Sequence, residues 1–237
     1  MDEKAIQVHR PPADTRSMTN FPEWGNFSRV RVALASTTVL ATVVGVSVAL
    51  AGEPGTSTVA GTGAEGGTGD GGAATLARLH EPNDVAAQPG GGFLIADTLN
   101  HSIREVAGNG TISTVAGTGD DDFQGDGGPA DQADLSGPRG VAPLPGGGFL
   151  IADTENDLIR EVAENGTIDT AAGDGGLDLD QPRAVAPLPS GDFLIADTGN
   201  HVIRKVTSLG ANSVVAGTGA PGYSCLLYTS PSPRDRS

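Results

Sequence analysis

One six-residue phrase, Phe-Leu-Ile-Ala-Asp-Thr, occurs three times in the chain and constrains its fold more than any other feature. The copies begin at Phe93, Phe149 and Phe193, which lie 56 and 44 residues apart. A second phrase recurs in step with the first, as Thr-Val-Ala-Gly-Thr-Gly at 58–63 and 114–119 and in changed form at 170–175 and 214–219. Repeats of roughly 40–50 residues are typical of propellers and solenoids, in which each small unit is stable only against its neighbours.

Within each unit the pieces have the length of short strands. In the second copy, residues 140–142, 149–152, 158–162 and 167–172 are apolar or alternating runs separated by turn residues. Asn165-Gly166 predicts a hairpin, and 153–156 predicts a tight turn whose Asp and Asn side chains accept local backbone N–H bonds. Four strands per 44 residues make one propeller blade. We therefore expect residues 52–224 to be all-β, an incomplete β-propeller of three to four four-stranded blades.

The unequal spacing of the copies comes from an insertion. The phrase Gly-Asp-Gly-Gly lies inside it at 69–72 and again at 125–128, whereas the third copy lacks the insertion. Loops on a rigid scaffold commonly carry binding residues. Asp70, Asp121, Phe123 and Asp126 are therefore candidates for ligand binding.

Together these phrases resemble the NHL repeat of exported bacterial proteins. The residues that carry the resemblance are Ile-Ala-Asp-Thr, then Asn-His at 100–101 and 200–201, then Ile-Arg at 103–104, 159–160 and 203–204. The second copy departs from the pattern with Asn156-Asp157, and the resemblance covers residues 56–219. Complete NHL domains are usually six-bladed, so the resemblance implies an incomplete propeller here.

Residues 32–51 form an uncharged hydrophobic segment of 20 residues. At about 1.5 Å per residue, a helix of this length crosses a hydrocarbon core. Arg29 and Arg31 precede it, which favours an N-terminus in the cytoplasm and export of the residues after the segment. Residues 1–31 are then a short cytoplasmic tail. The domain stays anchored in the cell membrane, facing outward, or is secreted after cleavage of a signal peptide near Ala51.

Charge separates the domain from nucleic-acid-binding proteins. Residues 52–224 contain 24 acids and seven Lys or Arg residues, a formal net charge of −17. Nucleic-acid binding depends on Lys and Arg replacing counterions at the phosphates. We therefore expect no nucleic-acid partner.

Residues 225–235 match nothing upstream. They read Cys-Leu-Leu-Tyr-Thr-Ser-Pro-Ser-Pro-Arg-Asp, which resembles the translation of a sequencing adapter. We expect residues 225–237 to be a non-native tail and the natural chain to continue differently after Ser224. Cys225, the single cysteine, then has no role.

Nine polar residues recur at fixed places in the repeat and are expected to be structural, because a catalytic site needs different groups in different roles. They are Asp97, Asn100, Arg104, Asp153, Asn156, Arg160, Asp197, Asn200 and Arg204. Asp120, Asp122 and Asp126 are weak candidates for a Ca²⁺ site, without the spacing of a calcium loop. No catalytic or cofactor residue is predicted, with Ca²⁺ or Zn²⁺ as the conceivable metals.

Three functions remain open. The first is a non-catalytic extracytoplasmic binding or scaffold module for a protein, peptide or glycan. The second, suggested by related propellers, is a lyase or lactonase with a metal in the central channel. The third is the outer sensor domain of a signalling system.

Overall fold

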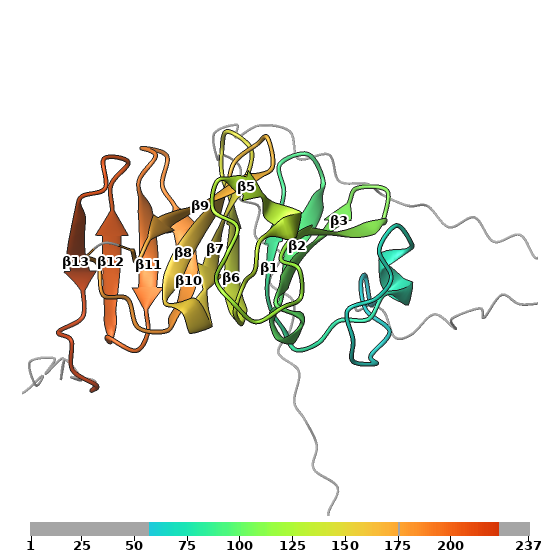
Figure 1. The fold of residues 1–237 in the computed structure, drawn as a ribbon, viewed down its shortest axis with the longest axis horizontal. Coiled ribbons are helices and arrows are strands. Elements are labelled where there is room, and N and C mark those ends of the chain that lie inside the picture. Colours follow the sequence, from blue (N-terminus) through green and yellow to red (C-terminus); the bar gives the residue numbers. More distant parts are fainter. Residues whose placement is uncertain (1–56, 175, 223–237) are drawn as a thin grey trace, which may run out of the picture. The chain divides into compact units, whose positions relative to one another are not determined.

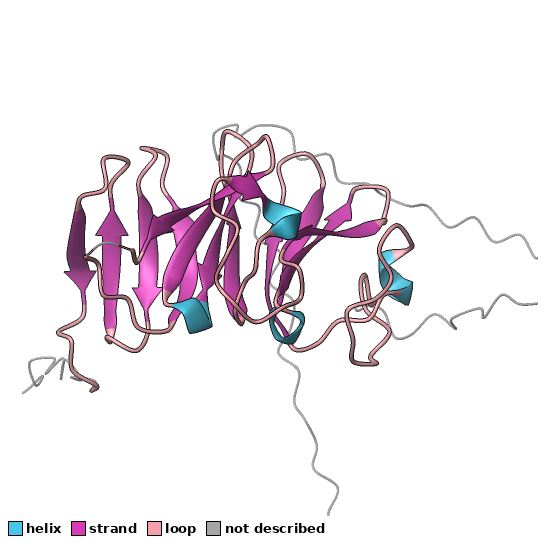
Figure 2. Cartoon of the chain, in the orientation of Figure 1, coloured by secondary structure: helices cyan, strands magenta, loops and turns pink. Residues whose placement is uncertain are grey.

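The computed structural model describes residues 57–174 and 176–222 (Figure 1). The hydrophobic segment at 32–51, its predicted helix and the tail at 225–237 lie outside these residues, so the expectations about them stay predictions. In the part of the chain that is described, no helix is long and apolar enough to span a membrane. Strands joined by loops and short 3₁₀ helices make up the described fold (Figure 2).

The strands form three antiparallel sheets, here called blades 1, 2 and 3, with consecutive strands as neighbours. Blade 1 contains β1 (Pro82–Ala87), β2 (Gly92–Asp97), β3 (Ser102–Ala107) and β4 (Ile112–Ala116). Blade 2 contains β6 (Pro138–Pro143), β7 (Phe149–Asp153), β8 (Leu158–Val162) and β9 (Thr167–Ala172), with the short β5 (Gly128–Pro129) outside β9. Blade 3 contains β10 (Pro182–Pro187), β11 (Phe193–Asp197), β12 (Val202–Val206) and β13 (Asn212–Ala216). The all-β prediction with four-stranded units is confirmed.

Successive blades pack through their innermost strands, as in a β-propeller. β1 contacts β6, and β6 in turn contacts β10 (Figure 1). One hydrophobic core lies between blades 1 and 2 and a second between blades 2 and 3. Leu150 belongs to the second core and Ile151 to the first, so both faces of β7 are covered. This explains why the repeated phrase is continuously apolar. The described residues are thus three blades of an incomplete β-propeller.

Burial changes where a neighbouring blade is missing from the described residues. Val141 and Val185 are 3% and 8% exposed, whereas Val85, at the same position in blade 1, is 63% exposed. On the opposite faces, Ile103 and Ile159 are fully buried and Ile203 is 36% exposed. Each blade therefore has one apolar face for the preceding blade and one for the following blade.

All three blades share one register, including a β-bulge between the third and fourth strands. In blade 1, Ile103 pairs with Ala116, but the next residue, Arg104, pairs with Thr114, which leaves Val115 as the extra residue of a β-bulge. The same shift occurs at the Ile-Arg step of blades 2 and 3. Because of this bulge, the N–H of Thr114 points to the outer edge of the blade, where it donates to Asp70.

The insertion lies along the outer edge of the blade that follows it. Its second copy supplies β5, which pairs with β9, and the 3₁₀ helix η3 (Ala130–Gln132). Its first copy supplies η1 (Ala74–Leu76) and a bridge between Ala73 and Thr111 of blade 1. The sequence located the insertion but did not predict that it adds an edge strand.

The hairpin predicted at Asn165-Gly166 joins β8 to β9, whereas the turn predicted at 153–156 was wrong in detail. In the hairpin at 165–166, Gly166 has a positive φ, whereas Asn165 instead accepts the N–H of Thr167 with its side chain. After β7, the chain forms the 3₁₀ helix η4 (Thr154–Asn156) and ends it with Asp157 at φ 58°. Asp153 does not cap that helix, because its carboxylate binds a segment 17 residues upstream.

Candidate functional site

Each blade buries one aspartate at the end of its second strand. Asp97, Asp153 and Asp197 are all fully buried. In blade 2, the Oδ1 atom of Asp153 accepts the backbone N–H of Ser136 at 2.7 Å. Asp97 and Asp197 accept the N–H groups of His80 and Asp180 in the same way, again from 17 residues upstream. Each aspartate therefore ties its strand to the segment by which the chain enters the same blade.

The asparagine three residues later binds the same carboxylate. Asn156 Nδ2 donates to Asp153 Oδ2 at 2.9 Å and to the carbonyl of Asp122 at 3.0 Å. Asn100 and Asn200 bind Asp97 and Asp197 in the same way. One amide thus joins the turn after the second strand to the loop that precedes the blade.

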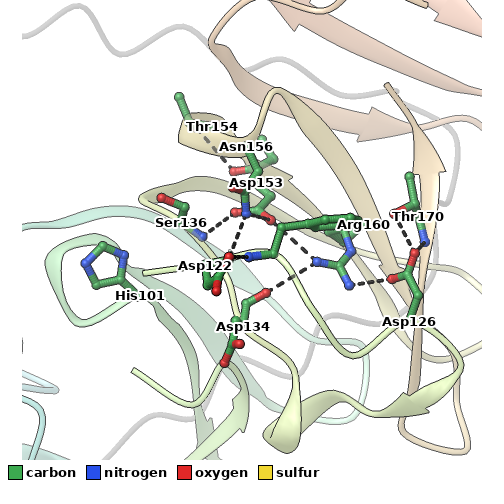
Figure 3. A network of polar contacts seen from close by, with 12 residues as sticks. His101, Asp122, Asp126, Asp134, Ser136, Asp153, Thr154, Asn156, Arg160 and Thr170 are labelled. Carbon is green, nitrogen blue, oxygen red and sulfur yellow. Dashed lines mark hydrogen bonds and ion pairs between the residues drawn. The ribbon is translucent and has the colours of Figure 1, made fainter. Parts of the chain in front are cut away.

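The arginine of the third strand completes the network, shown for blade 2 in Figure 3. Arg160 is fully buried, and its Nη1 lies 3.6 Å from Asp153 Oδ2 while its Nη2 bonds Asp126. Arg104 lies in the same way between Asp97 and Asp70. Each of these arginines therefore has one acid from its own blade and one from the insertion.

Both oxygens of the insertion's aspartate are engaged within the fold. Asp126 Oδ1 accepts from Arg160, and its Oδ2 accepts the N–H and hydroxyl of Thr170 at 3.2 and 2.7 Å. Asp70 likewise accepts from Arg104 and from the N–H of Thr114 at 3.1 Å. The two loop candidates Asp70 and Asp126 therefore bind the insertion to its own blade.

Burial dominates the pKa values of two of the buried aspartates, Asp153 and Asp97. It raises the pKa of Asp153 to about 6, against the hydrogen bonds of Asn156 and Ser136 and the charge of Arg160. Burial likewise raises the pKa of Asp97. At Asp70, burial also acts to raise the pKa, but the bonds from Thr114 and the pairing with Arg104 outweigh it and hold the pKa below its usual value. In blade 1, the inner acid Asp97 thus retains its proton more readily than the outer acid Asp70.

The weak calcium candidates do not converge. Asp126 is engaged with Arg160 and Thr170, while Asp122 accepts the N–H of Phe123, and both Asp120 and Asp122 are exposed. Among residues 57–174 and 176–222, no three His, Cys, Asp or Glu side chains form a group that could hold a metal ion.

The other two loop candidates also contact their own blade. The guanidinium carbon of Arg160 lies 4.9 Å from the centre of the Phe123 ring, within cation–π distance. The Asp121 carboxylate accepts the hydroxyl of Ser136. Phe123 still leaves 43% of its surface exposed.

Two repeat positions that link neighbouring blades were not predicted from the sequence to do so. The hydroxyls of Thr98 and Thr154 donate to the carbonyls of Pro138 and Pro182 in the next blade, both at 2.7 Å. His101 and Asp157 accept the N–H groups of Gly137 and Gln181. Neutral imidazole and carboxylate are both acceptors, so His and Asp serve equally at this position. The recurrence of Thr was the available signal.

A groove of about 740 Å³ lies between blades 2 and 3, at the end formed by the hairpin turns. Leu144, Leu150, Leu188 and Phe193 are among its apolar lining residues, and its acids are Glu161, Glu164 and Asp192. Lys205 is 2.7 Å from Asp192 and, through this hydrogen bond, lowers the pKa of Asp192.

The corresponding groove between blades 1 and 2 is smaller, about 470 Å³, and Pro129 and Asp131 of the insertion line it. The third copy has no insertion to line the groove between blades 2 and 3, and this groove has the larger volume of the two. Sequence reasoning missed its acids because a groove between two blades combines residues with no fixed spacing.

No protein-family model and no curated protein sequence matches the chain. Solved structures with a similar fold include a virginiamycin B lyase from Staphylococcus aureus, 16% identical over 59% of this chain and 42% of its own, with a TM-score of 0.44. An auxiliary nutrient binding protein from Bacteroides thetaiotaomicron is 20% identical over 55% of this chain and 36% of its own, with a TM-score of 0.45. A chain of a nidogen/laminin complex is 19% identical over 59% of this chain and 49% of its own, with a TM-score of 0.46. The chain spans less than half the length of each of these structures.

Proposed function

We propose that the chain is a non-catalytic binding module of the NHL-repeat type that holds a peptide or protein segment in the groove between blades 2 and 3. The groove itself carries the proposal, because it combines an apolar lining with carboxylates at the one blade junction that lacks an insertion. The engagement of the repeated polar residues with one another supports a structural rather than catalytic role for them. The hydrophobic segment at 32–51 supports a location outside the cytoplasm.

The chemistry of the groove favours a ligand with apolar and basic side chains. Glu161 and Glu164 lie beside Leu150 and Ala171, so an apolar side chain can be buried while a neighbouring Lys or Arg meets a carboxylate. The charge of −17 over residues 52–224 also speeds the approach of a basic ligand.

Titration of the full chain with a labelled hexapeptide of alternating Lys and Leu tests this proposal. We expect saturable binding that weakens about tenfold in the Glu161→Gln/Glu164→Gln variant, since two ion pairs are lost. The matched control, Asp131→Asn/Asp169→Asn, removes the same charge from exposed positions and should bind as the unchanged chain does. Equal weakening in both variants, or equal binding of a Glu–Leu hexapeptide or of maltohexaose, would overturn the assignment.

Metal analysis separates the binding module from the metal-dependent lyase or lactonase. The proposal expects no stoichiometric Zn²⁺ or Ca²⁺ in the purified full chain. A metal that copurifies one-to-one and resists dialysis would favour the enzyme.

A further inference from the structure

Blades 1 and 2 carry the same kind of extra segment on their outer edges. In blade 2, Gly127 N–H donates to the Ile168 carbonyl at 2.8 Å, and Ala130 N–H donates to the Gly166 carbonyl at 2.9 Å. In blade 1, Gly71 and Ala74 donate in the same way to Ile112 and Gly110, at 2.8 and 2.9 Å. Both segments lie antiparallel to the outermost full strand, as an added strand does.

An aspartate anchors each added segment at one end. Asp126 precedes Gly127 and bonds Arg160 together with the N–H and hydroxyl of Thr170. Asp70 precedes Gly71 and bonds Arg104 and the N–H of Thr114. The recognised element is therefore an Asp followed by two glycines, in which the first glycine has a positive φ and closes a tight turn at the start of the added segment.

Blade 3 retains the receiving edge without the segment. In the described part of the chain, β13 has no strand on its outer side, and all its residues are exposed. Asn212 holds the position of Ile112 and Ile168, and Val214 pairs with Arg204 as Thr114 and Thr170 pair with their arginines. The carbonyl of Gly210 and the backbone of Asn212 and Val214 thus repeat the donors and acceptors that are bonded in the other blades.

Arg204 is also retained. Its Nε bonds Asp197 Oδ2 at 2.5 Å, and its Nη2 reaches only the Asp178 carbonyl, at 3.4 Å. Its side chain is 18% exposed, against 1% and 0% for Arg104 and Arg160. In those two blades, Nη2 is the atom that bonds the insertion's aspartate.

One position of this edge is polar in blade 3 and apolar in the other two blades. Ile112 and Ile168 are fully buried, but blade 3 has Asn212 at that position. An exposed apolar strand edge invites aggregation, whereas a polar one tolerates solvent between binding events.

We propose that the outer edge of blade 3 binds a segment of another protein by strand addition, with a turn at the motif Asp-Gly-Gly and the Asp carboxylate on Arg204. Main-chain bonds to Gly210, Asn212 and Val214 supply affinity, and the Asp supplies specificity. This site goes beyond the groove function and does not use Glu161 or Glu164.

The probe is a labelled peptide with the sequence of residues 123–132, Phe-Gln-Gly-Asp-Gly-Gly-Pro-Ala-Asp-Gln. Fluorescence polarisation with the full chain should show saturable binding. The same peptide with Asn in place of the first Asp should bind about tenfold more weakly, because the charged hydrogen bonds are lost.

Two variants at one exposed position place the peptide on β13. Val214→Pro removes the edge N–H and should abolish binding. Val214→Thr restores the hydroxyl present in Thr170 and should strengthen binding. The Glu161→Gln/Glu164→Gln variant should bind this peptide as the unchanged chain does, even if the groove proposal fails. Absent binding, equal affinity of the Asn peptide, or unchanged binding by Val214→Pro would each overturn the proposal.

Discussion

Asp126 in the insertion and Arg160 on β8 form an ion pair across 34 residues of sequence. Arg160 is fully buried and its other acid, Asp153, has a raised pKa. The insertion therefore supplies a second acidic partner to a buried cation, which makes it an integral part of the blade.

Replacing Asp126 should loosen the insertion. We expect Asp126→Asn to lower the free energy of unfolding by about 2 kcal/mol, since the charged bonds to Arg160 and Thr170 are weakened. Asp131→Asn, an exposed change in the same insertion, should stay within about 0.5 kcal/mol of the unchanged chain. Urea denaturation measures both, and equal midpoints would show that the ion pair is dispensable.

The hydroxyl of Thr98 should matter more than that of its repeat counterpart. Thr98 is 1% exposed, donates to the Pro138 carbonyl in blade 2 and accepts from Asn83, whereas the exposed Thr198 donates to Ala196 within its own blade. We expect Thr98→Val to lower the unfolding free energy by about 1.5 kcal/mol because it leaves buried groups without partners. Thr198→Val should lower it by less than about 0.5 kcal/mol. Thermal denaturation of the two variants measures both changes. A larger loss of unfolding free energy for Thr198→Val than for Thr98→Val would contradict the inter-blade role of Thr98.

Gly117 is required where the outer strand leaves blade 1. Its φ is +94°, and a Cβ there would overlap the His101 carbonyl oxygen. We expect Gly117→Ala to lower the unfolding free energy by at least about 2 kcal/mol. At Gly146 a Cβ meets nothing within 4 Å, so Gly146→Ala is the matched control and should have little effect. If chemical denaturation gives both the same midpoint, the close approach is not constraining.

Stability should depend on pH through Asp153. Its pKa of about 6 in the fold exceeds the value near 3.9 expected when unfolded. The folded state therefore binds this proton more tightly, so the associated stability is fully present below about pH 4 and is lost as pH rises through 6. The loss amounts to at most about 3 kcal/mol. The raised pKa of Asp97 acts in the same direction.

The variant Asp153→Asn isolates that dependence from the effect of net charge. Urea denaturation at intervals from about pH 4 to 7 should give a flatter profile for Asp153→Asn than for the unchanged chain. Asp169→Asn removes an exposed acid of equal charge and should keep the slope. Parallel profiles for Asp153→Asn and the unchanged chain would place the pH dependence elsewhere.

Local patterns predicted the strands well and the polar contacts poorly. The apolar run at β8, Leu158–Val162, lies between turn residues, and the prediction matched its bounds. By contrast, Asp153 binds Ser136 and Asp126 binds Arg160, contacts that depend on how distant segments meet. Polar residues in a glycine-rich loop carry no periodic signal, so Asp126 suggested a surface ligand site rather than an internal fastening. The groove acids, which meet residues of the next blade, were hidden for the same reason.

The unequal covering of the blades has a consequence for how the fold opens. Blade 2 has both faces and its outer edge covered, whereas Val85 of blade 1 and Ile203 of blade 3 are exposed on faces that no other blade covers within residues 57–174 and 176–222. In repeat architectures, stability adds up through nearest-neighbour contacts. Amide hydrogen exchange should therefore be slowest in β7 and β8 and fastest in β13, although the three repeats share the same motifs. Local unfolding would then begin in blades 1 and 3 and reach blade 2 last. The stability of each repeat against opening would thus depend on its position in the array.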